Sequence, residues 1–316
     1  MSFSSFLKLV EIQTKVASII PFLLGTVYTL YNYNNFSIKN FLFMFISLFA
    51  FDMTATAVNN YYDYKRAKKT KGYNYETHNA IVRDKLSEGK VIGTIIFLLI
   101  TAIIFGILLF LNTSIVILLL GAMSFIVGIF YSAGPLPINR TPFGEIFSGF
   151  FMGFIIVFIS VYIHIYDLRI VNILYESGML NVGLDISQII SIFLISLPAV
   201  VGIANIMLAN NICDIEDDIE NKRYTLPINI GRKKALLLFK SLYYIAYIDI
   251  LILGILKIIP SISLITLLTF IVINKNIKLF LNKQTKKDTF VLAVKNFVLI
   301  NITYILTFII AFVFKL

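Results

Sequence analysis

The stretch NNYYDYKRAKKT (residues 59–70) brings two amides, a carboxylate and a series of basic side chains to the end of a long apolar run. A second stretch, NNICDIEDDIENKR (210–223), repeats this order: an apolar run, then N-N-x-x-D, then basic residues. Polar groups of this kind are costly inside a bilayer and are expected where a helix leaves it. The two stretches therefore predict two long helices with similar polar clusters at their ends.

The composition is that of an integral membrane protein. Of the 316 residues, 59% are hydrophobic and 14% are charged, and the mean hydropathy is +0.88, whereas soluble domains carry about 25% charged residues. A transmembrane helix needs about 20 mostly apolar residues, and runs of that length recur along the chain. We predict one all-α domain, residues 1–316, with about nine transmembrane helices around a central cavity. The predicted spans are 10–31, 40–60, 91–111, 114–131, 143–166, 187–211, 236–257, 260–281 and 290–314.

The net charge of +10 is distributed as a membrane topology requires, which argues against a nucleic-acid partner. Basic residues cluster after the second, sixth and eighth predicted spans, and few follow the odd-numbered ones. Because cytoplasmic loops are enriched in Lys and Arg, we expect the N-terminus, both polar stretches and the open side of the cavity in the cytoplasm. The C-terminus is then outside a cell membrane that the chain crosses many times. The connection 167–186 is predicted to be a solvated outer loop.

The two N-N-x-x-D stretches begin at residues 59 and 210, which suggests two related halves with motifs at 59–66 and 210–223. Sites at the interface of internal repeats are common in membrane proteins. A single short match also fits two independent helix ends, so both interpretations stay open.

The acidic residues of the two stretches favour a hard metal ion. Asn59 and Asp63 are four residues apart and share one helix face, as do Asp214 and Asp218; Asn211 lies on the same face as Asp214. Carboxylate and amide oxygens are ligands suited to Mg²⁺ rather than zinc. The sequence therefore predicts one Mg²⁺ site shared by the two helix ends.

Basic residues beside such a site favour a diphosphate ligand. Mg²⁺ bridges carboxylates to phosphate oxygens, and Lys or Arg neutralises the remaining charge. The candidate cations are Lys65, Arg66, Arg83, Lys222 and Arg223. In a membrane cavity the fitting substrate has a diphosphate head and a lipid tail, together with an electron-rich acceptor that attacks the allylic carbocation left behind. We infer no obligate protein partner.

Two other interpretations compete with this one. Polar helix ends can be simple interfacial groups. Two matched stretches on the same side of the membrane favour a shared site over that interpretation. A cation-coupled carrier would also use acidic residues, but carrier sites usually lie near the bilayer midplane. Asp52 is the acid that the predicted spans place at that depth.

Four blocks of sequence resemble the membrane aromatic prenyltransferases of the UbiA superfamily, and within them most closely the enzymes that prenylate 1,4-dihydroxy-2-naphthoate in menaquinone synthesis. The blocks are NNYYDYKR (59–66), AIVRD (80–84), YSAGPLPINRTPFGE (131–145) and NNICDIEDDIENKRYTLPINIGRKKA (210–235).

The resemblance implies a transferase activity and roles for particular residues. Asn59, Asp63, Asp214 and Asp218 would position Mg²⁺ and a polyprenyl diphosphate, with Arg83 and Lys222 as the foremost diphosphate cations and Tyr131 near the cavity mouth. The ring would be prenylated with loss of its carboxylate as CO₂, giving demethylmenaquinone. Another acceptor, such as 4-hydroxybenzoate, stays open.

The chain departs from the family's pattern at three places. The further acid of the first motif is absent near Ala67 and Lys69, which leaves Glu76 or Asp84 as possible substitutes. Asn60 stands where an acid is common, and Cys213 where an arginine is common. These departures bear on the first metal position and on the choice of substrate.

Two further residues are candidates for binding the acceptor. Asp52 lies inside the second span, where a carboxylate is costly and is a functional candidate by default; a structural hydrogen bond to Thr54 or Asn59 explains it equally well. Lys15 follows Glu11 by four residues, so the two either form a simple ion pair or serve the acceptor at the cavity mouth.

Overall fold

The computed structural model describes residues 1–316 except 68–75, 77–78, 177 and 316. Within this described part, nine helices are long and apolar enough to cross a membrane. They are Ile12–Tyr33, Ile38–Arg66, Glu88–Leu111, Ile115–Ser132, Gly144–Leu168, Ile186–Cys213, Arg232–Ile255, Ser261–Asn282 and Phe290–Phe314. The predicted all-α membrane fold is confirmed, and each predicted span overlaps one of these helices.

Several spans combine more than one element. The first joins the 3₁₀ turn η1 (Ile12–Lys15) to α2 (Val16–Tyr33), and the fifth joins α7 (Gly144–Ser148), the π-helix η4 (Gly149–Ile155) and α8 (Ile156–Ile165). The eighth joins the 3₁₀ helix η6 (Ser261–Thr269) to α13 (Phe270–Asn282). The single-element spans are α3 (Ile38–Arg66), α5 (Glu88–Leu111), α6 (Ile115–Ser132), α9 (Ile186–Cys213), α12 (Arg232–Ile255) and α14 (Phe290–Phe314).

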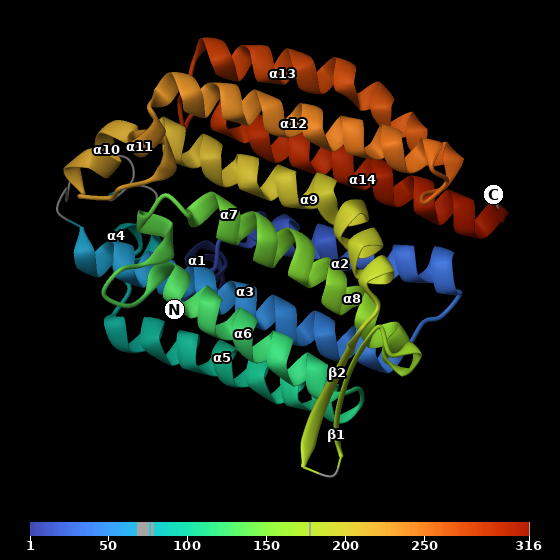
Figure 1. Cartoon of the computed structure of the whole chain (residues 1–316). Coiled ribbons are helices and arrows are strands. Elements are labelled where there is room, and N and C mark those ends of the chain that lie inside the picture. The colour runs from blue at the N-terminus through green and yellow to red at the C-terminus, as the bar shows by residue number, and fades with distance from the viewer. Residues whose placement is uncertain (68–75, 77–78, 177, 316) are drawn as a thin grey trace.

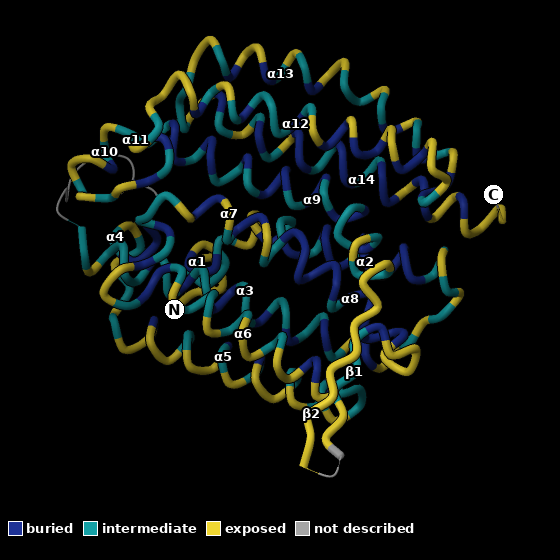
Figure 2. Tube along the Cα trace, in the orientation of Figure 1, coloured by how far each residue is buried: buried dark blue, intermediate teal, exposed yellow. Residues whose placement is uncertain are grey.

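The spans lie roughly antiparallel in two groups (Figure 1). Helices α9, α12, α13 and α14 pack on one side, and α3, α5 and α6 pack on the other, with α2 and α7–α8 between them. The tube in Figure 2 is buried mainly along the central helices, whereas α5 and α13 at the two edges expose long apolar faces. Exposed apolar faces of this kind are expected where lipid is the solvent.

Local sequence explains where the long helices begin. The Ser37 hydroxyl accepts a hydrogen bond from the Asn40 amide at the start of α3, and the Asp185 carboxylate accepts one from Gln188 at the start of α9. Both are ordinary N-cap contacts. Pro21 and Pro198 lie inside α2 and α9, where neighbouring helices in a membrane protein can compensate for the missing backbone donor.

Short elements cover the end of the bundle at which α3 and α9 finish. They are α1 (Phe3–Leu9), α4 (Ala80–Arg83), η3 (Ile138–Arg140), α10 (Ile215–Glu220) and α11 (Leu226–Ile230). The two polar stretches therefore end at the same side of the molecule (Figure 1).

The opposite end carries a β-hairpin that was not predicted. Strands β1 (Val171–Glu176) and β2 (Met179–Leu184) pair antiparallel after the short turn η5 (Tyr166–Leu168). They form the only sheet in the part of the chain described. The sequence predicted a solvated outer loop over 167–186 and did not predict these strands.

An elongated apolar cavity of about 430 Å³ lies between α3, α5, α6 and the α7–α8 span. Its wall includes Met44, Phe51, Phe125, Phe151 and Ile159. The central cavity predicted from sequence is thus present, and its lining is suited to a hydrocarbon chain.

Candidate active site

The first polar stretch forms the last turns of α3. Asn59 donates from its amide nitrogen to Asp63 Oδ2 at 3.4 Å, so the predicted spacing of four residues brings the two side chains together. The Asn59 amide oxygen accepts hydrogen bonds from Ser132 Oγ at 2.9 Å and from Asn139 Nδ2 at 3.0 Å. The loop that follows α6 therefore fixes the orientation of Asn59.

Asn60, where an acid was expected, has a structural role in this chain. Its buried amide nitrogen donates to the Leu9 carbonyl at 2.9 Å and to Glu11 Oε1 at 3.1 Å. Its own carbonyl accepts from the Asn79 amide at 2.9 Å. Asn60 thus joins α1 and the segment before α4 to α3.

The second polar stretch spans the junction of α9 and α10. Asp214 is both the C-cap of α9 and the N-cap of α10, and its carbonyl accepts from the Asp218 backbone amide at 2.7 Å. Asp218 is only 4% exposed. Burial raises its pKa to about 7, an effect that the nearby Arg223 opposes.

Arg223 joins the two stretches. Its Nη2 lies 2.5 Å from Asp63 Oδ1 and its Nε lies 3.7 Å from Asp218 Oδ1. Burial by itself would lower the pKa of Arg223, but the surrounding carboxylates, Asp63 first, raise it overall. One guanidinium therefore stands between acids that are far apart in sequence.

The turn after α10 explains why Arg223 makes this contact and Lys222 does not. Lys222 has a φ of 53°, in the left-handed region, and its side chain is exposed. The chain turns back there, so the Arg223 amide donates to the Asp218 carbonyl at 2.8 Å. Such left-handed residues commonly end a helix.

Lys286 and Arg140 also belong to the cluster, although sequence reasoning assigned both only to membrane topology. Lys286 Nζ lies 2.7 Å from Asp214 Oδ2 and donates to Asn210 Oδ1 at 2.5 Å. Burial lowers the pKa of Arg140, and the nearby positive charge of Arg223 lowers it further. Their only sequence signal is positive charge in loops at the same end of the bundle.

Of the other predicted cations, Lys65 and Arg83 pair with acids outside this cluster, and Arg66 lies beside it. Lys65 pairs with Glu88 on α5 at 2.7 Å, and Arg83 pairs with its neighbour Asp84 at 2.8 Å. That pairing with Arg83 lowers the pKa of Asp84. Arg66 stacks on Tyr62 and donates to the Gly134 carbonyl at 2.7 Å, which keeps it near Arg140.

Asn211 and Tyr131 lie between the cluster and the cavity. Asn211 donates to Glu145 Oε1 at 2.8 Å, so its amide nitrogen contacts an acid on α7. The Tyr131 hydroxyl is 2.7 Å from Ser148 Oγ, and both residues line the cavity. Tyr131 precedes Ser132, which donates to Asn59. The polar cluster therefore begins beside one end of the apolar cavity.

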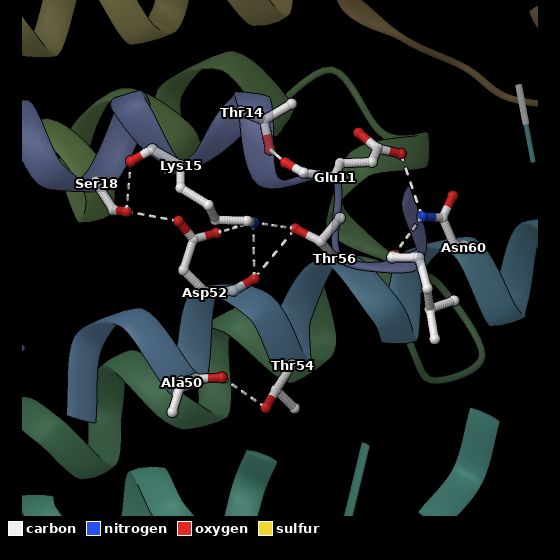
Figure 3. Close-up of polar contacts among 10 residues, drawn as sticks. Glu11, Thr14, Lys15, Ser18, Ala50, Asp52, Thr54, Thr56 and Asn60 are labelled. Carbon is white, nitrogen blue, oxygen red and sulfur yellow. Dashed lines mark hydrogen bonds and ion pairs between the residues drawn. The ribbon is translucent and has the colours of Figure 1, made fainter. Parts of the chain in front are cut away.

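Lys15 and Asp52 form a buried ion pair inside the membrane span (Figure 3). Lys15 Nζ donates to Asp52 Oδ1 at 2.7 Å, to the Asp52 carbonyl at 3.1 Å and to Thr56 Oγ1 at 2.6 Å. Ser18 Oγ donates to Asp52 Oδ2 at 2.5 Å. Lys15 is 1% exposed and all three of its protons are used, whereas Asp52 and Ser18 line the cavity.

Glu11 and Lys15 do not share a helix face, because Glu11 adopts a left-handed conformation before η1. Asp249 on α12 is a second buried acid inside a span, and its Oδ2 lacks a hydrogen-bond partner among the described residues. Sequence reasoning overlooked it, although a lone acid in a predicted span was a sufficient signal.

The donor set fits Mg²⁺ in its chemistry. Asn59, Asp63, Asp214 and Asp218 offer only hard oxygen ligands, and Arg223 already places one positive charge between Asp63 and Asp218. Within the described ranges, no three His, Cys, Asp or Glu side chains are grouped closely enough to hold a metal as they stand. Asp63 and Asp218 are instead close to Arg223, and Asp214 is paired with Lys286.

The fold is similar to that of several solved structures. The apo structure of a UbiA homologue from Aeropyrum pernix K1 matches with a TM-score of 0.67 at 16% identity, over 92% of this chain and 97% of that one. Digeranylgeranylglyceryl phosphate synthase matches with a TM-score of 0.64 at 18% identity, over 99% of each chain. A UbiA homologue from Archaeoglobus fulgidus bound to GPP and Mg²⁺ matches with a TM-score of 0.62 at 14% identity, over 98% of this chain and 99% of that one. At these identities the likeness concerns the fold.

Sequence comparison gives a nearer relative. The chain is 32% identical over 236 residues to the 1,4-dihydroxy-2-naphthoate octaprenyltransferase of Bacillus subtilis (strain 168), which covers 75% of this chain and 69% of the relative. The sequence profile of the UbiA prenyltransferase family matches residues 18–312. By its sequence and its fold, this chain belongs to the UbiA prenyltransferase family.

Proposed function

We propose that this prenyltransferase moves a polyprenyl group from its diphosphate to 1,4-dihydroxy-2-naphthoate in an Mg²⁺-dependent reaction. The observation that carries the proposal is the position of two acidic helix ends beside one end of an apolar cavity. Ala55 lines that cavity and lies one helical turn before Asn59 on α3. The identity with the Bacillus subtilis enzyme supports the choice of acceptor.

The cluster at the helix ends binds the diphosphate. Asp63, Asp214, Asp218 and Asn59 hold the metal, which when bound acts as a Lewis acid on the leaving group. Arg223, Lys286, Arg140 and Arg66 neutralise the remaining charge on the phosphate oxygens. Arg223 and Lys286, which now pair with these carboxylates, would be available to the diphosphate if the carboxylates held the metal.

The cavity excludes water from the reacting carbon. The polyprenyl tail lies among its Phe, Met, Ile and Leu side chains, which leaves C1 at the polar end. The bond from C1 to oxygen breaks with its electron pair on the diphosphate. The ring carbon that bears the carboxylate bonds to C1 and then releases CO₂, whose bonding electron pair stays in the ring and restores its aromaticity. Exclusion of water prevents hydrolysis of the reactive carbon.

Asp52 contacts the acceptor in this proposal. Two of the lone-pair sites on its carboxylate are taken by Lys15 and Ser18, and a carboxylate has roughly four. Because Asp52 lines the cavity, a remaining site can accept a hydrogen bond from a ring hydroxyl. Lys15 holds Asp52 in place and neutralises it, and does not itself reach the acceptor. Tyr131 borders the same space.

The test uses purified protein with Mg²⁺ and a polyprenyl diphosphate, and offers 1,4-dihydroxy-2-naphthoate and 4-hydroxybenzoate in separate reactions. We expect a prenylated naphthol with release of CO₂, and reversible loss of both when EDTA removes the metal. Asp63→Asn should lower kcat by about 10²–10³-fold, because loss of several kcal/mol of electrostatic stabilisation costs about tenfold per 1.36 kcal/mol.

Asp288→Asn is the matched control, because Asp288 is an exposed carboxylate in the Lys286 loop that pairs with Lys283. It should keep wild-type activity. Prenylation of 4-hydroxybenzoate alone would overturn the acceptor, and full activity of Asp63→Asn would overturn the site.

A further inference from the structure

The β-hairpin at the end of the bundle opposite the acidic cluster has one fully apolar face. The register pairs Val171 with Leu184, Ile173 with Val182 and Tyr175 with Leu180, and paired residues project to the same side. The alternate pairs, Asn172 with Gly183 and Leu174 with Asn181, project to the other side. Met179, near the turn, also lies on this second side. One face of the hairpin is therefore wholly apolar, whereas the other combines Asn172 and Asn181 with Leu174 and Met179.

The apolar face is uncovered along β2 and at Tyr175 near the tip. Tyr175, Leu180, Val182 and Leu184 are 74%, 64%, 56% and 52% exposed. Val171 and Ile173, at the root of the same face, pack against the helical core. The face thus continues outward from the protein interior as an apolar surface.

The root of the hairpin is fixed to the ends of membrane-spanning helices. The Tyr162 hydroxyl donates to the Val171 carbonyl at 3.1 Å and lies 2.8 Å from Ser114 Oγ, which precedes α6. The Asp185 amide donates to the Ile170 carbonyl at 2.9 Å. From this root the strands extend across the helix direction, past the ends of α5 and α6 (Figure 1). The hairpin is therefore placed at the level where the spans leave the bilayer.

We propose that the hairpin is an interfacial membrane anchor, with its Val171–Ile173–Tyr175–Leu180–Val182–Leu184 face buried in the lipid leaflet beside α6. Three observations select lipid as the occupant. Val171 and Ile173 direct this face toward the bundle, the neighbouring surface of α6 exposes apolar Ile115 and Leu119, and the opposite face is the more polar one, with Asn172 and Asn181 beside Leu174 and Met179. Elements with one apolar and one polar face lie in the interface in this way.

Water is a poor alternative for this face. An isolated two-stranded hairpin is at best marginally stable in water, and four exposed apolar side chains in a row would lower its stability and solubility further. Lipid removes that cost, and Tyr175 at the interface fits the preference of tyrosine for this depth.

The experiment exploits the absence of tryptophan from the chain. Tyr175→Trp places a single fluorophore on the apolar face, and Asn181→Trp places one on the polar face as a matched control. Each full-length variant is reconstituted in nanodiscs, with and without lipids brominated near the headgroup end of the acyl chains. Emission is then quenched with aqueous iodide in separate samples.

We expect the tryptophan at 175 to be blue-shifted, quenched by brominated lipid and protected from iodide, and the tryptophan at 181 to show the reverse. Equal access of iodide to both positions would overturn the proposal. Protection of position 175 without quenching by brominated lipid would also overturn it, since a protein or a second copy would then cover the face.

A second variant guards against a misfolded hairpin. Val182→Asp, added to Tyr175→Trp, should release the face from lipid and expose the tryptophan to iodide. Prenyl transfer, which uses the other end of the bundle, should be retained by all three variants. Continued quenching by brominated lipid in the double variant would show that the apolar face does not hold the hairpin.

Discussion

Arg223 is the residue on which the two acidic motifs depend, because it contacts both Asp63 and Asp218. In the substrate-free arrangement it neutralises acids that would otherwise repel each other across a partly buried site. In the proposed reaction the same guanidinium would be available to phosphate oxygens once the acids held a metal. We therefore expect one side chain to serve the site both before and after substrate binds.

We predict that Arg223→Met raises the Kd for the polyprenyl diphosphate by about 10–100-fold, because hydrogen bonds to charged groups contribute about 1.5–3 kcal/mol. Lys65→Met is the matched control. Lys65 is only two residues from Asp63 but pairs with Glu88 at the surface, where solvent screens the ion pair. Donor binding by calorimetry distinguishes them, and equal Kd values would remove Arg223 from the site.

The Lys15–Asp52 pair permits a sharper test of acceptor binding. Asp52→Asn should raise the KM for the acceptor and leave the KM for the donor unchanged. It also leaves Lys15 charged and uncompensated, and breaking a buried pair costs about 3–5 kcal/mol of stability. A loss of activity in this variant alone therefore does not identify the cause.

The double variant Lys15→Met/Asp52→Leu separates the two effects. It removes both charges and should recover thermal stability, since apolar replacement of a buried pair is often neutral or stabilising. If Asp52 contacts the acceptor, the acceptor KM stays high in this stable protein. A wild-type acceptor KM would mean that the pair only joins η1 to α3.

Sequence could predict the acids but only some of the cations. The acids follow each other at helical spacing on one face, so local geometry brings them together. Lys65 is two residues from Asp63, a spacing that turns it to another face of α3 and toward α5. Lys286 contacts Asp214 from a loop more than 70 residues later. The spacing of neighbouring residues in the sequence cannot predict such a contact.

At the level of helices, the close approach of η4 to α9 rests on glycine. A Cβ added at Gly153 would lie 2.4 Å from Val200 Cα, and one at Gly149 would lie 2.8 Å from the Val200 carbonyl oxygen. These glycines lie in the π-helical segment, which adjoins cavity residues Phe151 and Met152. The helices could not approach as closely with larger residues.

We predict that Gly153→Ala destabilises the folded protein by about 1–3 kcal/mol, the usual range for overpacking a tight core. Gly93→Ala is the control, because a Cβ there meets nothing within 4 Å and alanine favours a helix by about 0.5–1 kcal/mol. Thermal unfolding in detergent should place Gly153→Ala below wild type and Gly93→Ala at or above it. The reverse order would refute the packing argument.

Hydropathy predicted the helices well because lipid imposes one rule along a whole span: about 20 apolar residues with internal hydrogen bonds. The hairpin was not predicted because its strands are short and because the acidic residues of the connection 167–186 suggested a solvated loop. Its alternation, with Val171, Ile173 and Tyr175 on one side, was nevertheless a strand signal. The π-helical segment has no comparable signal, because its geometry depends on Val200 in another helix.

For the whole molecule, the orientation in the membrane is still a prediction from charge. Lys and Arg gather at the end of the bundle that holds the acidic cluster, and such loops are usually cytoplasmic. The hairpin then lies in the outer leaflet.

Single-cysteine variants test this orientation in a Cys213→Ser background, since Cys213 is the sole cysteine. Lys233→Cys marks the cluster end and Asn181→Cys marks the hairpin, and both positions are exposed. In intact cells a membrane-impermeant maleimide should label position 181 and should reach position 233 only after permeabilisation. The opposite pattern would invert the topology and place the site outside.

The cavity has a further kinetic consequence. Three of its lining residues, Ile103, Ile107 and Leu118, are also exposed on the lipid-facing side of α5 and α6, so the wall around the tail borders the bilayer itself. For a substrate that arrives from lipid, the concentration that sets the rate is its surface density in the membrane rather than its concentration in the bulk solution. Adding empty lipid or detergent at constant donor should therefore slow turnover by surface dilution, while diluting the whole sample with buffer should leave the rate per enzyme nearly unchanged.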